Sequence, residues 1–208
     1  MNKRLVVLSL LSLVLAMTWG PSSYGSEQSV LHWEVNAALG LTGGPTPEQL
    51  ATGKPALFSE EEIQILRESE IAACKLYQRV LALYAQGGRG GEMDKFGLSG
   101  LILSRAQARH AWAQGKVSLT VARMEQAVKF AEYLVAASEA AYNADTITLD
   151  AMVTATESLG ATKLSLIQLK RALRRLGYDL ADVSMQPQID PKKPNLEKDC
   201  SESPNPFD

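Results

Sequence analysis

The stretch AYNADTITLDAMVTATESL, residues 141–159, decides the fold because it joins two helix-forming segments through a short polar turn. Tyr142 stands at the end of a long run of helix formers. Beyond the turn, Thr148 or Asp150 can cap a returning helix. The stretch therefore predicts the tip of an antiparallel helical hairpin, with Tyr142 and Leu149 able to pack across the bend.

The hairpin lies within a predicted helical domain, residues 59–177, which is almost free of proline and rich in Ala, Leu, Glu, Gln, Lys and Arg. Its first helix is predicted to begin at the sequence SEEE, residues 59–62. There the Ser59 hydroxyl can accept from a backbone amide of the first turn while the Glu62 carboxylate reaches back, as in a capping box. The glycine cluster at 87–91 predicts the turn that ends this helix.

The central segment, 94–142, has no strong stop signal, so it predicts a single helix of about 75 Å. Steps of three and four in its second half form a heptad seam. The seam residues are Val117, Val121, Met124, Val128, Ala131, Val135, Ser138 and Tyr142. In the first half, the matching register holds small residues that would allow a neighbouring helix to approach closely. These residues are Leu101, Ser104, Ala108, Ala111, Gly115, Ser118 and Ala122. Gly115 could instead break the helix, since glycine costs about 1 kcal/mol there relative to alanine.

The last predicted helix runs from the tip to Leu176, and Gly177 can take the left-handed position that closes it. Helices in the order short, long, short predict an all-α fold, namely an elongated antiparallel coiled coil in which the two short helices lie along the long one. Such a rod has little interior, so exposed apolar stripes should attract further helices. A homo-oligomer is therefore among the expected assemblies.

The N-terminal flank predicts export. Residues 1–25 read as a signal peptide, because Lys3 and Arg4 precede an apolar run of about 13 residues that falls short of the ~20 needed to cross a bilayer. The mature chain is thus expected to lack a transmembrane segment and to be periplasmic, outer-membrane-associated or secreted. Residues 26–58 predict a flexible tether, with a brief helix favoured at 30–39.

The C-terminal flank, residues 178–208, is expected to be a Pro-rich disordered tail. It has too few apolar residues to offset the conformational entropy that the chain would lose on folding. The sequence has two cysteines, Cys74 in the first helix and Cys200 in the tail. They either pair and tie the tail down or remain unpaired. The sequence leaves both states open, and unpaired thiols are the expectation.

No catalytic, cofactor-binding or metal-binding residues are predicted. His110 lies in mid-helix with no Cys, Asp or second His at metal-binding spacing, so we expect a partly buried helix residue, while His32 lies in the tether. The glycine cluster lacks the Lys and Ser/Thr of a P-loop.

With 21 basic and 23 acidic residues, the chain lacks the excess of positive charge that binding to nucleic acid requires. The chain is thus predicted not to be an enzyme; the alternative class is a small secreted hydrolase or metal-dependent enzyme with no recognisable motif.

Residues 141–155, followed by Leu159 and Leu166, resemble the periplasmic helical hairpin of TolC-type outer-membrane efflux proteins. In that family an aromatic residue ends the long helix, a Thr/Ile-type turn follows, and an Asp opens the returning helix. The short, long, short order over residues 60–176 is also similar to the family's coiled-coil repeat. The membrane-barrel strands of that family are not predicted here, so the resemblance covers the helical hairpin region only. It implies a component of an efflux or secretion assembly.

The sequence thus predicts an exported coiled-coil scaffold that presents helix faces or a hairpin tip to protein partners in the cell envelope. Nucleic acid is not an expected partner, and no cofactor is expected. The predicted partner-binding tip consists of Tyr142, Asp145, Thr146, Ile147, Thr148, Leu149 and Asp150. The alternative implied by the resemblance is a role in a TolC-like efflux or secretion assembly.

Overall fold

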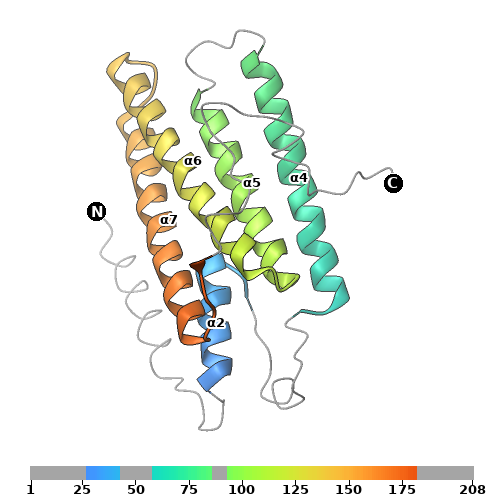
Figure 1. Ribbon diagram of the computed structural model, residues 1–208. Coiled ribbons are helices and arrows are strands. Elements are labelled where there is room, and N and C mark those ends of the chain that lie inside the picture. Colours follow the sequence, from blue (N-terminus) through green and yellow to red (C-terminus); the bar gives the residue numbers. More distant parts are fainter. Residues whose placement is uncertain (1–26, 43–57, 86–92, 182–208) are drawn as a thin grey trace, which may run out of the picture.

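The computed structural model describes residues 27–42, 58–85 and 93–181. The helices in these ranges are α2 (Glu27–Leu39), α4 (Glu60–Ala85), α5 (Met93–Ala113), α6 (Val117–Asn143) and α7 (Leu149–Arg175) (Figure 1). These ranges contain no strand, so the predicted all-α class is confirmed. The predicted signal peptide, the glycine cluster and all of the predicted tail beyond residue 181 lie outside the described residues.

The predicted single helix over residues 94–142 is wrong, because the chain folds back at Gly115. This residue has a φ of 73°, in the left-handed region that glycine adopts without steric cost. Its N–H bonds to the carbonyl of Trp112 at 2.9 Å, and the next N–H, of Lys116, bonds to that of Ala111 at 2.9 Å. The central element is therefore the hairpin of α5 and α6, and the short, long, short order is not present.

Glycine also sets the spacing between α5 and α6. A Cβ atom placed on Gly100 would lie 2.2 Å from the ring of Phe130, and one placed on Gly97 would lie 3.0 Å from Cα of Leu134. Only a residue without a side chain allows this approach. The predicted seam of small residues in the first half is buried in α5, at Leu101, Ser104, Ala108 and Ala111. The close helix packing was thus predicted correctly. The main partner of α5, however, is α6, which was predicted to continue the same long helix.

The helices from α4 to α7 follow one another across the molecule in sequence order, each packed on the next (Figure 1). One core cluster fills the space between α4, α5 and α6 around three aromatic rings, Tyr77, Phe96 and Phe130. Their centroids are 5.6 to 6.0 Å apart, the separation of favourable aromatic pairs. A second core cluster joins α2, α5, α6 and α7 around Trp112 and Leu169.

The flexible tether predicted for residues 26–58 is wrong in its first part, where α2 is docked into the second core cluster. Val35 and Leu39 are buried there, and the Trp112 indole N–H donates to the Asn36 side-chain oxygen at 2.7 Å. The Arg109 guanidinium donates to the carbonyl of Leu39 at 2.7 Å, which satisfies the end of the helix. The brief helix favoured at 30–39 is confirmed, and residues 43–57 lie outside the described residues.

The predicted start of α4 and the predicted end of α7 are confirmed. The Ser59 N–H donates to a Glu62 carboxylate oxygen at 2.7 Å, and the Glu62 N–H donates to the Ser59 hydroxyl at 3.2 Å, so the capping box is formed. At the other end of the domain Gly177 has a φ of 85°. The Tyr178 N–H bonds to the carbonyl of Leu173 at 3.0 Å, which is the Schellman closure expected after such a residue.

The expectation of unpaired thiols is wrong for Cys74. This residue is buried in α4 and is disulfide-bonded. The sequence holds one other cysteine, Cys200, which lies outside the described residues. The disulfide adds a covalent constraint to α4, the helix that carries Tyr77 of the aromatic cluster.

Candidate functional site

The hairpin tip between α6 and α7 is where the sequence placed the partner-binding residues, and the turn occurs where predicted. Asp145 has a φ of 54°, a left-handed conformation that Asp tolerates better than most side chains. The Asp145 N–H bonds to the carbonyl of Tyr142 at 2.9 Å, and the Thr146 N–H bonds to that of Ala141 at 2.9 Å. The backbone of the tip is thus held by hydrogen bonds to the last turn of α6.

Polar tip residues build the turn. The Thr146 hydroxyl donates to the carbonyl of Ala141 at 2.8 Å. The Thr148 hydroxyl accepts from the Ala151 N–H at 3.3 Å, so Thr148 is the N-cap of α7. Asp150 lies in the first turn of α7, where the helix dipole favours a negative charge. The Thr146 and Thr148 side chains therefore have a structural role that fixes the bend.

Apolar tip residues face solvent. Tyr142 is 38% exposed and Leu149 is 51% exposed, so the two do not form a buried contact across the bend. The packing of Tyr142 against Leu149 stays a prediction, because two partly exposed side chains can still contact each other. Two large apolar side chains at one end of a hydrogen-bonded hairpin are the feature expected of a contact surface.

A groove of about 300 Å³ opens beside the tip, where the start of α5 meets the end of α6 and the start of α7. Its wall is mainly apolar, with Ile147 from the tip, Leu98 from α5, Leu134 from α6 and Ala151 from α7. The polar side chain of Lys95 stands at the groove. This volume is at the lower end of the range for ligand pockets, about 300 to 1,000 Å³, so the groove suits an apolar side chain of a partner.

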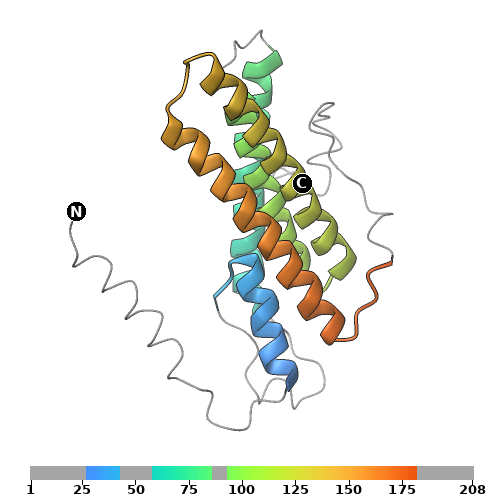
Figure 2. The same ribbon diagram turned by 90° about the vertical axis from the view of Figure 1, so that its left-hand side faces the viewer.

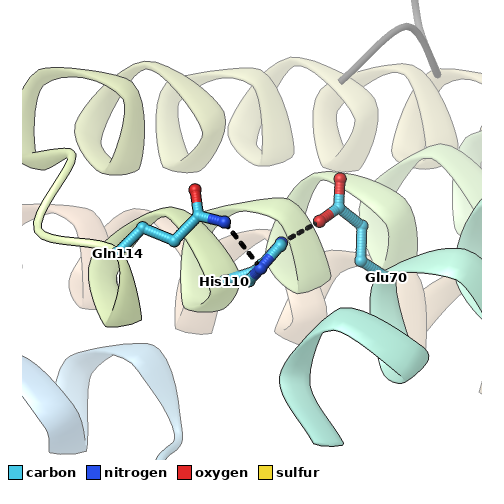
Figure 3. A network of polar contacts seen from close by, with 3 residues as sticks. All are labelled: Glu70, His110 and Gln114. Carbon is cyan, nitrogen blue, oxygen red and sulfur yellow. Dashed lines mark hydrogen bonds and ion pairs between the residues drawn. The ribbon is translucent and has the colours of Figure 1, made fainter. Parts of the chain in front are cut away.

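A second hollow, of about 440 Å³, lies between α4 and the junction of α5 with α6, and three polar residues meet beside it (Figure 3). His110 Nδ1 lies 2.5 Å from a carboxylate oxygen of Glu70. The side-chain nitrogen of Gln114 lies 2.8 Å from His110 Nε2. An amide nitrogen can only donate, so in this orientation of the Gln114 amide its N–H donates to His110 Nε2, and Nδ1 is the ring nitrogen that faces the Glu70 carboxylate.

His110 and Glu70 are both buried, at 6% and 4% exposed. A carboxylate that orients an imidazole is a component of many acid–base sites. The described lining of the hollow, however, contains no Ser, Thr or Cys that could act as a nucleophile. The described residues also include no group of three His, Cys, Asp or Glu that could hold a metal ion. The geometry matches a polar clamp between α4 and α5.

Sequence reasoning predicted a partly buried His110 but missed its partner. Glu70 lies 40 residues away in the sequence, on another helix. A local signal was present, because Glu70 occurs on the same face of α4 as the apolar residues Leu66, Ala73 and Tyr77. A charged residue on a buried helix face requires a partner from a neighbouring element.

His32, placed in the tether by the sequence, is instead a core residue of α2. Its ring lies 5.9 Å from that of Trp112, and burial lowers the pKa of His32. The neutral imidazole is therefore the form that fits this site.

Comparison of the chain with protein-family models, curated proteins and solved structures found no match. Within the described part of the chain, none of the helices combines the length and apolar content that a membrane crossing requires. The contacts, exposure and charges of its own residues are thus the basis for assigning a function.

Proposed function

We propose that this protein is an exported, non-enzymatic helical scaffold that binds a cell-envelope protein through the tip of the α6–α7 hairpin. The observation that carries the proposal is that Tyr142 and Leu149 are exposed on the same hairpin tip as Ile147, which lines the apolar groove. Export and the cell envelope rest on the signal peptide predicted for residues 1–25.

The tip is suited to binding because it is both apolar and preorganised. Large apolar side chains that face water favour a partner that removes them from water, at about 25 cal/mol per Å². The hydrogen bonds of Thr146 and Thr148 hold the turn in place, so little conformational freedom is lost on binding. Tyr142 is the residue type that most often anchors such contacts.

The occupant that fits the groove is a helix or loop with one protruding aliphatic or aromatic side chain. The groove wall is mainly apolar and accepts an apolar group. We assign the Glu70–His110 pair a structural role, since its hydrogen bonds join two helices.

An alternative proposal is that the partner belongs to a TolC-like efflux or secretion assembly. Its support is the similarity of residues 141–155 to the periplasmic hairpin of that family. The fold-back at Gly115 removes the long middle helix, so the support comes from the α6–α7 hairpin alone.

The test is photo-crosslinking in cell envelopes with the photoreactive residue at position 147. We expect one or a few discrete crosslinked proteins, and we expect the double variant Tyr142→Ser/Leu149→Ser to abolish their recovery while circular dichroism is unchanged. The matched control is Ile65→Ser, because Ile65 is an equally exposed apolar residue on α4. Undiminished recovery with the double variant would contradict the proposal.

A further inference from the structure

The outer face of α7 carries a row of exposed residues that no function assigned so far uses. Because an α-helix turns about 100° per residue, residues 153, 156, 160, 164 and 167 lie within about 80° of one another. The row consists of Val153, Thr156, Gly160, Leu164 and Ile167. Leu164 and Ile167 are each 55% exposed.

This row lies on the opposite side of α7 from the residues that pack inside the protein. Those are buried, and they include Ala155, Thr162 and Leu169. In Figure 2, α7 lies nearest the viewer, with α6 behind it and α2 beside its C-terminal half. We name the five exposed residues the α7 outer row.

The α7 outer row is symmetric about Gly160. Val153 and Ile167 lie seven residues before and after it, and Thr156 and Leu164 lie four residues before and after it. Two copies of α7 that run antiparallel and cross at Gly160 therefore place Val153 of each copy against Ile167 of the other. A Cβ atom at Gly160 would meet nothing within 4 Å, so the centre of the row is open to a second helix.

The charged residues of α7 are also distributed in a way that favours an antiparallel pair. The acidic residues of α7, Asp150 and Glu157, both precede Gly160. Its basic residues all follow Gly160, and they are Lys163, Lys170, Arg171, Arg174 and Arg175. An antiparallel pair brings the acidic half of each copy next to the basic half of the other, whereas a parallel pair would align like charges.

We propose that the α7 outer row binds a second copy of this chain, with the two α7 helices antiparallel and the two-fold axis at Gly160. The surface is self-complementary, which is the requirement for an interface between identical subunits related by a two-fold axis. Its centre carries the smallest residue, and Val153, Leu164 and Ile167 around it are aliphatic, so the helix backbones can approach closely and cover the apolar side chains.

The dimer would determine how the tips are displayed. The tip lies about 15 residues before Gly160, and at about 1.5 Å per residue the antiparallel pair places the two tips at opposite ends, about 45 Å apart. The surface is separate from the tip and groove, so the inference goes beyond the proposed function and does not require it.

Light scattering coupled to size-exclusion chromatography tests the association. We expect the purified protein to have the molar mass of two chains, and the variant Leu164→Glu/Ile167→Glu to have that of one chain with unchanged helicity. The matched control is Leu76→Glu/Leu83→Glu, which introduces the same charges on exposed apolar residues of α4. A monomeric native protein, or dissociation by the control and not by the α7 variant, would overturn the proposal.

Disulfide crosslinking tests the orientation. Mild oxidation should link Gly160→Cys chains to each other, and a mixture of Val153→Cys chains with Ile167→Cys chains should give the mixed dimer in preference to either like pair. The described native cysteine is already bonded, so it does not compete. Like pairs at position 153 in place of the mixed dimer would show a parallel arrangement and overturn the proposal. A dimeric Tyr142→Ser/Leu149→Ser variant that has lost its crosslinked partner would show that association and tip binding are independent.

Discussion

Gly100 of α5 lies directly against the ring of Phe130 of α6, with no room between them for a methyl group. Of the described glycines, Gly100 is the one at which an added Cβ atom would meet a neighbour most closely. Because Phe130 also contacts Tyr77 and Phe96, its ring cannot move without disturbing the aromatic cluster.

The first prediction follows from that contact. Gly100→Ala is expected to lower the free energy of unfolding by about 1 to 3 kcal/mol, the usual cost of overpacking, despite the higher helix propensity of alanine. Chemical denaturation measures the change. The matched control is Gly160→Ala, where the added methyl meets open space. It is made in the Leu164→Glu/Ile167→Glu variant, which is expected to be monomeric, so that the proposed dimer contact does not affect the result. That change should be neutral or stabilising by up to about 1 kcal/mol. Equal effects of the two changes would contradict the tight contact.

A second prediction concerns the hydrogen bond that fixes α2. Asn36→Leu leaves the buried Trp112 N–H without its acceptor, which should cost about 1 to 3 kcal/mol in the free energy of unfolding. The comparison is Glu34→Gln on the same helix, which removes an exposed ion pair with Arg175. Exposed pairs contribute about 0 to 1 kcal/mol, so this variant should unfold at nearly the native denaturant concentration. A similar loss in both variants would show that α2 is held by other contacts.

A third prediction treats Glu70 and His110 as a coupled pair. Removing either side chain alone strands a buried polar partner, so Glu70→Leu and His110→Leu should each destabilise the protein. The double variant should lose less than the two single losses combined, with a coupling of about 0.5 to 3 kcal/mol. A double-mutant cycle by urea denaturation gives this value. Additive losses would mean that the two residues do not depend on one another.

The fourth prediction is a pH dependence from His32. Burial lowers its pKa in the folded state, so below the ordinary value of about 6.5 the unfolded chain binds more protons at this residue. The free energy of unfolding should therefore fall as the pH decreases through about 6.5, with no contribution from His32 well above that pH. The native protein and His32→Leu are compared by denaturation at about pH 7.5 and about pH 5. The loss on acidification should be smaller in the variant, and an equal loss would assign it to other groups.

The fifth prediction tests the cause of the fold-back. Gly115 has open space around it but a left-handed backbone, so Gly115→Ala should cost about 1 to 2 kcal/mol through backbone strain alone. Thermal unfolding measures the loss. Gly115→Asn, with a side chain that tolerates this conformation, should recover part of it. Full stability of the alanine variant would indicate that the junction does not require a left-handed residue.

Helix ends could be predicted from the sequence because their signals are local. Ser59 and Glu62 are three residues apart and complete a capping box by themselves, and Thr148 caps α7 with its own first turn. The position of the tip follows from the same kind of signal. Its exposure does not, because whether Tyr142 is covered depends on elements distant in the sequence.

The break at Gly115 could not be settled from the sequence because the local preference is small. A glycine inside a helix costs about 1 kcal/mol relative to alanine, which packing easily outweighs in either direction. Here the fold-back brings Gly100 against Phe130 and joins both to the aromatic cluster. The Glu70–His110 pair and the docking of α2 depend likewise on contacts between distant segments.

The docking of α2 on α7 has a consequence for the order in which the protein folds. Helices α4 to α7 each pack on the next in sequence, so their contacts can form while the chain is still being delivered. Helix α2 is different, because its main partner begins about 110 residues after it ends. Under the proposed export from the N-terminus, α2 would be delivered before α7 and could dock only after α7 had arrived. Until then its apolar side chains are available to a chaperone.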